Sequence, residues 1–402
     1  MFKKTSTLIL IIYIFIAATS AIAGTTYKIN RLGQFNYFNQ PALLGKGGSG
    51  LSVLDPHTIN TINPAGIISA PVTKFEAEFI HESTGIKSDN TEGLSHYTNV
   101  NGVRLAVPLI VNKMVISLGL RPLTYNELQA SETTRLSTGN KYTRELDDDG
   151  SLNQVSFGMA MSFKERFIVG VNANFNFGKT EEIWKVIFVS DLFRDTEDRI
   201  VSKMWGGSFS AGIITKLSSA WNVGAVYTSA MPLKMNNNIE YTFGESSETV
   251  HSDITIPHMF SIGSSYTIKE KTRFSVDYLY HPISEIEIDD EVVGGYEDTH
   301  SLSMGVELLP SRGYLVPLYS KLTYRIGFNY SKLGYIDSEG NDVTQYMGTL
   351  GIGLPYFGGF GRVDVAMGLG KRGNLSNNSI EETIYKITLS VSGGEKWFVR
   401  PK

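Results

Sequence analysis

The stretch from Gly45 to Gly50 reads GKGGSG and matches the glycine pattern of a dinucleotide-binding turn. Such a turn brings backbone amides close to a pyrophosphate. It needs a strand before it, a helix after it and an acidic residue about 20 positions further on. Here NQPALL precedes the glycines and LSVLDP follows them, without a βαβ pattern. We therefore expect no cofactor, and we expect these glycines to allow close backbone packing or positive φ angles.

Other residue types that support catalysis or metal binding are scattered. No H-E-x-x-H motif occurs, and Ser49 lacks a G-x-S-x-G frame. The acidic runs at 147–150 and 285–291 lack the spacing of a calcium-binding loop. Solvated rim histidines are favoured over a hydrolase site on the rim of a barrel; the four in question are His81, His96, His281 and His300. The sequence predicts no catalytic, cofactor or metal site and no enzyme.

Composition and the N-terminus limit the class of protein. The 402 residues carry a formal net charge of −4, which does not favour a nucleic-acid partner. Lys3 and Lys4 precede an apolar run at 8–18, and Ala21–Ala23 fits a cleavage site before Gly24, so residues 1–23 are predicted to be a signal peptide. No later apolar stretch approaches 18 residues, which leaves a soluble exported protein or a membrane β-barrel.

A period of two residues runs through the rest of the chain. In FIVGVNANFNF, residues 167–177, apolar side chains alternate with Asn172, Asn174 and Asn176. A helix would scatter these three amides, whereas a strand places them on one face. The pattern predicts about 14 strands, starting near residues 72, 96, 112, 151, 166, 202, 219, 251, 271, 299, 320, 345, 360 and 383. We interpret residues 233–243 as an extension of the strand that begins at Trp221.

The connections between these strands alternate in length. Long connections are expected at 82–95, 123–150, 179–201, 282–298, 332–344 and 372–382, and most of the others are short. Short periplasmic turns alternating with long outer loops are typical of an outer-membrane barrel. The alternative, a soluble β-sandwich, gives no reason for such alternation and has shorter strands. We therefore predict an all-β fold, a transmembrane antiparallel barrel at residues 72–394 followed by a tail at 395–402.

Residues 24–71 do not alternate and are rich in glycine. Asp55-Pro56 resembles a helix start, so a short helix is expected from Pro56 to Ile62, ending before Asn63. A compact segment ahead of a barrel wall favours a plug, or hatch, folded into the lumen. The predicted hatch residues are Gly45, Gly47, Gly48, Gly50, Asn63, Pro64 and Ala65.

This segment resembles the hatch of the long-chain fatty acid transporter family of outer-membrane barrels, which includes transporters of hydrocarbons and aromatic compounds. The resemblance rests on LLGKGGSGLSVLDPHTINTINPAGI, and on LGLRPLTYN and IPHMFSIGSSY further along the chain. Asn63-Pro64-Ala65 is its most specific motif. The chain departs from the family in running on through GGEKWFVRPK, in which Trp397 and Phe398 lie near the end but not at it, rather than ending on a terminal aromatic residue. The resemblance implies passage sideways through the wall at an inward kink in the third strand, here residues 112–122.

The third outer loop, EEIWKVIFVSDLF, carries apolar residues at helical spacing. An apolar stripe there either packs on a neighbouring loop or forms a groove that captures a hydrophobic substrate. The resemblance supports the groove. The candidate capture residues are Ile183, Trp184, Ile187, Phe188, Leu192 and Phe193.

Four arginines fall on the phases expected to face the lumen: Arg104, Arg121, Arg325 and Arg362. Arginine pairs well with a carboxylate ligand, so these are possible polar anchors for a substrate head group. Salt bridges within the lumen, with residues such as Asp277 and Asp364, are the favoured alternative.

These features predict passive uptake of hydrophobic molecules, such as long-chain fatty acids or hydrocarbons, across a bacterial outer membrane. The expected partners are outer-membrane lipid, the hydrophobic small molecule and the barrel-assembly machinery, and the expected state is a monomer. The alternative is a structural or shuttle barrel of a secretion system.

Overall fold

The computed structural model describes residues 25, 27, 32–88, 92–135, 140–190, 193–242, 247–311, 316–337, 339–356 and 360–397. The expected signal peptide and residues 398–402 of the expected tail lie outside these residues. Within the described ranges, no helix has the length and apolar character needed to cross a membrane.

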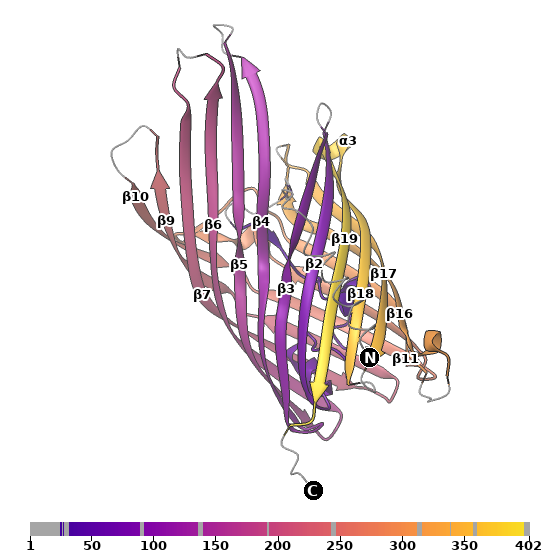
Figure 1. The fold of residues 1–402 in the computed structure, drawn as a ribbon. Helices are drawn as coiled ribbons and strands as arrows, with labels where there is room; N and C mark the ends of the chain where they lie inside the picture. Colours follow the sequence, from indigo (N-terminus) through magenta and orange to yellow (C-terminus); the bar gives the residue numbers. More distant parts are fainter. Residues whose placement is uncertain are drawn as a thin grey trace, which may run out of the picture.

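The fold is one antiparallel sheet that closes on itself, because β19 pairs with β2 along its length (Figure 1). The wall segments are β2 (Thr73–Ser88), β3 (Glu92–Ile110), β4 (Met114–Arg135), β5 (Lys141–Phe163), β6 (Phe167–Phe188), β7 (Thr196–Lys216), β8 (Trp221–Thr228), β9 (Met231–Glu240), β10 (Glu248–Ile256), β11 (Met259–Ile268), β12 (Thr272–His281), β15 (Thr299–Leu308), β16 (Thr323–Ile336), β17 (Asp342–Tyr356), β18 (Gly361–Asn374) and β19 (Ile380–Glu395).

Two wall strands are each made of two consecutive segments: β8 with β9, and β10 with β11. Both β8 and β9 pair with β7, and they pair on their other side with β11 and β10 respectively. Each pair is interrupted for two residues, at 229–230 and at 257–258. Counted in this way the barrel has 14 strands, as the sequence predicts. The interpretation of residues 233–243 as a continuation of the strand from Trp221 is also confirmed.

The outer surface of the wall is apolar and the inner surface is polar. Phe167, Val169, Val171 and Phe175 are exposed on the outside, whereas Asn174 and Asn176 are buried in the lumen. A lipid-facing apolar band around a polar interior is the arrangement that a bilayer requires of a barrel. The apolar residues of the predicted alternation therefore face the lipid and the polar residues face the lumen, as expected.

The predicted lengths of the outer connections are wrong for three hairpins. β2–β3, β4–β5 and β6–β7 continue as paired strands through most of 82–95, 123–150 and 179–201. These extensions expose polar side chains on both faces, so the alternation that identifies a membrane strand fades there although pairing continues. Figure 1 shows the extensions as a tall wall formed by β4, β5, β6 and β7, rising above the rest of the barrel.

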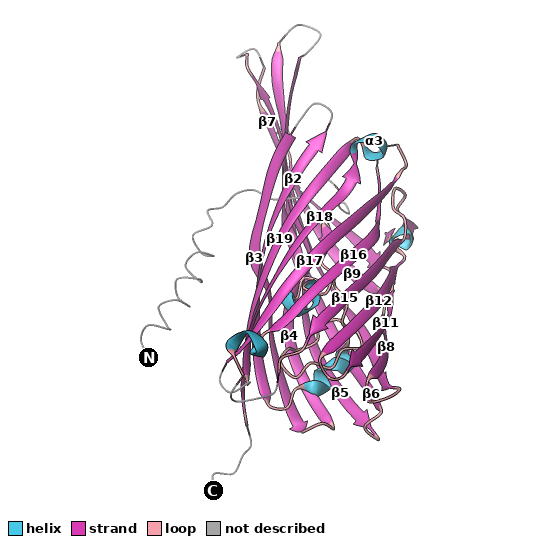
Figure 2. Ribbon diagram, turned by 90° about the vertical axis from the view of Figure 1, so that its right-hand side faces the viewer, coloured by secondary structure: helices cyan, strands magenta, loops and turns pink. Residues whose placement is uncertain are grey.

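Residues 32–72, which we call the lumenal segment, lie inside the barrel (Figure 2). They contain β1 (Gln34–Phe35), α2 (Pro41–Leu44) and the 3-10 helix η1 (Pro64–Ser69). The expected helix from Pro56 to Ile62 is wrong, since the chain forms only turns there. The amide of Ile59 donates to the Glu76 carboxylate of β2 at 2.8 Å instead of to a helical carbonyl.

The remaining short elements lie at the ends of the wall strands. They are η2 (Ile283–Glu285), β13 (Glu287–Ile288), β14 (Glu291–Val292), η3 (Leu318–Lys321) and α3 (Leu375–Asn378). Tight turns connect the strands at the end of the barrel opposite the tall wall. Lys164–Glu165 and Lys269–Glu270 have positive φ at both residues, as two-residue hairpin turns of matching twist require.

Candidate functional site

The glycine-rich stretch forms a turn after α2 that packs directly on the wall. Gly47 has a φ of 66°, and a Cβ there would lie 2.4 Å from the carbonyl oxygen of Phe328. The amides of Gly50 and Leu51 both donate to one oxygen of Asp277, at 2.6 and 2.7 Å. The loop thus binds an anion through its backbone, and that anion is a carboxylate of β12.

The Asn-Pro-Ala motif attaches the lumenal segment to β6 and β7. The side-chain oxygen of Asn63 accepts a hydrogen bond from the amide of Ala65 at 2.9 Å and so caps η1. Its amide group donates to the carbonyls of Leu51 at 2.9 Å and Ile213 at 3.3 Å. Gly170 gives the motif room, because a Cβ there would lie 2.3 Å from the Ala65 nitrogen.

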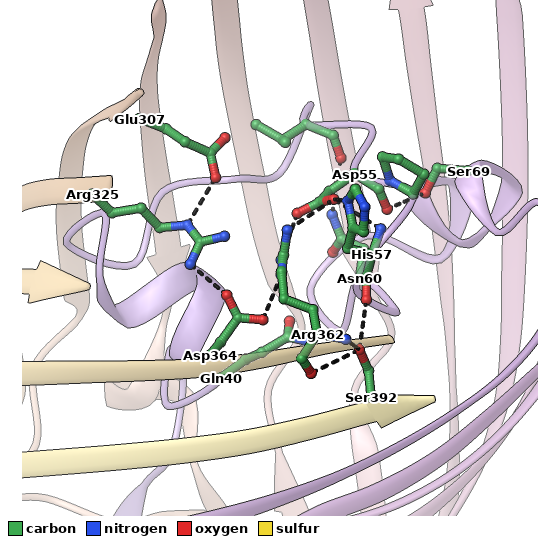
Figure 3. Close-up of polar contacts among 12 residues, drawn as sticks. Gln40, Asp55, His57, Asn60, Ser69, Glu307, Arg325, Arg362, Asp364 and Ser392 are labelled. Carbon is green, nitrogen blue, oxygen red and sulfur yellow. Dashed lines mark hydrogen bonds and ion pairs between the residues drawn. The ribbon is translucent and has the colours of Figure 1, made fainter. Parts of the chain in front are cut away.

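Asp55 joins the lumenal segment to a buried row of ions (Figure 3). Its carboxylate pairs with Arg362 of β18 at 2.8 Å, and Arg362 pairs in turn with Asp364 at 2.6 Å. Burial, the largest influence, raises the pKa of the Asp55 carboxyl, but the Arg362 guanidinium, His57 and Arg325 together outweigh it and hold that pKa well below its usual range. Asp55 is therefore an anion in the lumen.

The same row continues across the neighbouring wall strands. Arg325 of β16 links Asp364 at 2.6 Å to Glu307 of β15 at 2.8 Å, and Glu307 also pairs with Arg273 of β12 at 2.8 Å. Except for Arg273, whose side chain is 15% exposed, these wall side chains are almost fully buried. We call the six residues the ion ladder: Asp55, Arg362, Asp364, Arg325, Glu307 and Arg273.

The four predicted anchor arginines thus differ in their partners. Arg325 and Arg362 belong to the ion ladder, and Arg104 pairs with Glu78 of β2. Arg121 of β4 donates to the side chain of Gln154 at 3.2 Å, and no carboxylate of the described residues lies within ion-pair distance of it. Its role as an anchor stays a prediction. Of the four arginines, it is the one whose guanidinium forms no ion pair within the described residues, so it can pair with a carboxylate ligand.

The wall is interrupted between β3 and β4. Their pairing ends at Val103 and Leu120, and β4 carries an irregularity between Pro122 and Thr124. Proline cannot donate to a ladder, so its position at the break follows from its chemistry. β1 takes the place that β3 leaves, because Asn36 donates its amide to the Leu123 carbonyl at 2.7 Å.

Above the break, β4 lies on the lumenal side of β2 and β3. Tyr125 occupies the outward register of the β4–β5 pair, yet it is 5% exposed. Its ring stacks on Tyr97 of β3 at 4.6 Å, and its hydroxyl contacts Glu82 of β2 at 3.2 Å. Both partners occupy lumen-facing positions of their strands. The third strand therefore bends inward, at the place that the resemblance implies.

Two cavities lie in the lumen, and the same short segment lines both. The larger, about 1390 Å³ including its openings, reaches from Arg104 and Arg121 across the lumen to the interruptions at Ser229 and Pro257. The smaller, about 740 Å³, lies toward β15 to β19. Residues 35–38, which we call the partition, contact both cavities. The sequence analysis missed the partition, although its FNYF cluster of three aromatic residues marks it.

Four of the six candidate capture residues, Ile183, Trp184, Ile187 and Phe188, lie on a strand, so their predicted helical spacing is wrong. β6 runs to Phe188, and alternation places Trp184 and Phe188 on one face and Ile183 and Ile187 on the other. Leu192 lies outside the described residues. Phe188 stacks on Phe193 at 5.1 Å, and no described member of the set lines either cavity. Their role in capture stays a prediction.

The closed wall, the lipid-facing apolar band and the inward bend of the third strand define an outer-membrane β-barrel with the fold of the fatty acid and hydrocarbon transporters. A family model sharpens this class. The model described as BamG matches residues 1–402, and the chain belongs to the BamG family.

Solved structures support the fold. A FadL homologue of Pseudomonas aeruginosa is 12% identical, with 90% of this chain and 98% of that chain covered and a TM-score of 0.62. The toluene transporter TbuX of Ralstonia pickettii is 13% identical, with 91% and 99% covered and a TM-score of 0.61. The monoaromatic hydrocarbon channel CymD is 13% identical, with 90% and 99% covered and a TM-score of 0.57. These neighbours are transporters and channels rather than enzymes. A search of curated proteins gave no match.

Proposed function

We propose that the protein is a passive channel that takes up hydrophobic molecules, long-chain fatty acids or hydrocarbons, across the outer membrane. One observation carries the proposal: the larger cavity adjoins the break between β3 and β4. An oily solute entering this cavity has a sideways route into the bilayer and need not cross the polar lumen. The structural neighbours include toluene transporters and a hydrocarbon channel, which supports this substrate class.

In this proposal the lumenal segment acts as the hatch, and its partition controls the route. Phe35 and Thr124 are opposite each other where β1 pairs with β4. If β1 leaves the edge of β4, the two cavities join and the break widens. Arg121, beside the break, would attract the carboxylate of a fatty acid.

A reversible cross-link tests the proposal. The chain has no cysteine, so Phe35→Cys with Thr124→Cys introduces the only thiols. In a strain lacking the native protein, the oxidised double variant should accumulate at least about tenfold less labelled fatty acid or toluene than the same variant under reductant. The matched control is Tyr330→Cys with Tyr346→Cys, a pair within the continuous wall, whose oxidation should change nothing.

Two outcomes would contradict the proposal. The first is equal accumulation by the oxidised and reduced forms, with cross-linking verified by mass spectrometry. The second is unchanged accumulation of a full substrate panel after deletion of the protein. The first result would refute movement of the partition as the gate, and the second would remove hydrophobic uptake as the function.

The alternative is a structural or shuttle barrel of a secretion system. Mild purification separates the two candidates. A channel should carry lipid or detergent in the larger cavity as a monomer, whereas a structural barrel should retain a stoichiometric protein partner.

A further inference from the structure

The partition spans the lumen between two irregular parts of the wall. At one end, β1 pairs with the edge of β4 beside the break. At the other end, the rings of Phe35 and Tyr37 contact the ring of His281, the last residue of β12. His281 in turn contacts Pro257, where the wall is interrupted between β10 and β11. The partition therefore connects the break at β4 with this interruption.

His281 makes two polar contacts, one through each ring nitrogen. The hydroxyl of Tyr37 lies 2.9 Å from Nδ1, and the carbonyl oxygen of Pro257 lies 3.2 Å from Nε2. The rings of Phe35 and Tyr37 meet the imidazole edge-on, with ring centroids 5.1 and 6.0 Å away. Because His281 is buried and both of its nitrogens are engaged, its ring has a fixed orientation.

The Pro257 carbonyl determines which nitrogen of His281 carries the proton. Burial without a carboxylate partner among the described residues favours the neutral ring. A carbonyl oxygen can only accept, so Nε2 donates to it and Nδ1 accepts from the Tyr37 hydroxyl. This carbonyl is available because residues 257–258 lie between β10 and β11, outside the ladders of the described strands. The interruption in the wall thus supplies the group that orients His281.

The side chains that His281 holds lie where the two cavities meet. Phe35 and Tyr37 line both cavities, whereas His281 lines only the larger one. The two aromatic rings also stack on each other, with centroids 5.7 Å apart. Fixing Tyr37 therefore fixes Phe35, the residue of β1 that is opposite Thr124.

The pairing of β1 with β4 needs support from elsewhere. β1 has only two residues, and short strand pairs are marginally stable by themselves. We therefore expect its position on the edge of β4 to depend on the contacts at the other end of the partition, which are those with His281.

We infer that His281 is a positioning residue for the partition: it holds Tyr37 and Phe35 so that β1 stays on the edge of β4 and the two cavities stay apart. This inference rests on the proposed function, because it assigns His281 to the gate of the same route for hydrophobic molecules. Release of Tyr37 from His281 then frees β1 and joins the cavities.

Hydrogen exchange at the Asn36 amide measures the position of β1 on the purified full chain in detergent, because this amide donates to the Leu123 carbonyl. Tyr37→Phe keeps the ring and removes the hydroxyl. It should speed this exchange at least about tenfold, as expected for the loss of one buried hydrogen bond. The matched control is His258→Phe, which should leave the exchange unchanged. His258 lies at the same interruption, but it contacts the ring of Tyr227 and lines neither cavity.

Two amide variants of His281 separate its two hydrogen bonds. Asparagine places its oxygen near the position of Nδ1 and can still accept from Tyr37, whereas glutamine places its nitrogen near that of Nε2 and can donate to Pro257. Exchange at Asn36 should stay within about threefold of the wild-type rate in His281→Asn and rise at least about tenfold in His281→Gln. A residue that only filled space would not separate these two variants.

Accumulation of labelled toluene in cells tests the gate separately. Tyr37→Phe and His281→Gln should each accumulate at least about threefold more than the wild-type chain, because the open position of the partition is more populated. The folded, heat-modifiable fraction of each variant is measured alongside, and Tyr37→Phe, which keeps the shape of the side chain, provides the test if His281→Gln does not fold.

Two results would overturn the inference, whatever the accumulation. Unchanged exchange at Asn36 in Tyr37→Phe would show that β1 is held without His281. Equal exchange in the two amide variants would assign His281 to packing alone. Faster exchange with unchanged accumulation would instead support the positioning role and contradict the proposed function of the partition as a gate.

Discussion

The two sides of the barrel hold the lumenal segment in different ways. Toward β12 and β15–β18, the contacts are buried ion pairs and main-chain packing, with Asp55 on Arg362 and Gly47 against Phe328. At the break between β3 and β4, the contact is β1, a strand of two residues on an edge that the wall leaves unpaired, with side-chain hydrogen bonds from Asn36 to Asn101 and from Tyr125 to Gln34. The first side resembles a protein core, and the second resembles an interface between separable parts.

This difference suggests where movement is possible. Separating a buried ion pair leaves uncompensated charges and costs about 3–5 kcal/mol, whereas one short strand on an edge contributes a few hydrogen bonds of about 1 kcal/mol each. We therefore expect the lumenal segment to stay fixed at the ion ladder while its partition moves at β4. Each prediction below tests one part of this contrast.

The largest effect is expected at Gly47, on the fixed side. Gly47→Ala places a Cβ 2.4 Å from the Phe328 carbonyl in a left-handed conformation, so the chain must move or fail to assemble. The folded, heat-modifiable fraction should fall about tenfold or more. Gly340→Ala is the matched control, since Gly340 also has positive φ but has open space around it. Normal assembly of Gly47→Ala would mean that this side is not packed as described.

The next effect is expected at the ion ladder. Arg362→Ala leaves Asp55 buried without its cation and leaves Asp364 with Arg325 alone, and the free energy of unfolding should fall by about 3–5 kcal/mol. Denaturant titration at pH 7 measures this change. Lys371→Ala, on the same strand, removes an exposed pair with Glu381 and should cost no more than about 1 kcal/mol. Similar losses for the two variants would refute a fixed side held by buried charge.

The sequence predicts the wall well because the bilayer imposes a simple rule on it. Wherever lipid lies outside and polar groups lie inside, as at Phe167–Phe177, alternation identifies the strand and its direction. Above the bilayer both faces meet water, so the extensions of β4–β7 were taken for loops and Trp184 for part of a helix. Local sequence also could not reveal that the amide of Ile59 bonds to Glu76, a contact that replaces the expected helix.

The candidate site was predictable only in part for the same reason. The phase of a strand shows that Arg121 and Arg325 face the lumen, but not which carboxylates surround them. Asp364 is predictable, because it lies two residues from Arg362 on the same face of β18. Glu307 and Asp55 lie on other parts of the chain, and only the closed sheet and the lumenal segment bring them to Arg325 and Arg362. The break at β4 was suggested by Pro122, while the inward position of Tyr125 depends on pairing that the sequence does not encode locally.

A smaller effect, confined to one class of substrate, is expected at the mobile side. Arg121→Gln removes a guanidinium that has no carboxylate partner in the described part of the chain, so stability should change by less than about 1 kcal/mol. Accumulation of a labelled fatty acid should fall about three- to tenfold, because a charge-assisted hydrogen bond to its carboxylate is lost. Accumulation of toluene, which has no charge, should not change. Equal losses for both substrates would show that Arg121 shapes the route rather than binding a head group.

The smallest effect is expected at the tip of the tall wall, which contacts the lumenal segment on neither side of the barrel. Trp184 is 46% exposed and lies outside both cavities, so Trp184→Ala should leave assembly and unfolding unchanged. If Trp184 captures substrate before it reaches the lumen, the substrate concentration for half-maximal uptake should rise about two- to threefold at constant maximal rate. Val189→Ala, in the same hairpin and 76% exposed, is the control. A fall in the maximal rate would instead place Trp184 on the route itself, since a residue that only raises the local concentration of substrate cannot limit passage once the cavity is saturated.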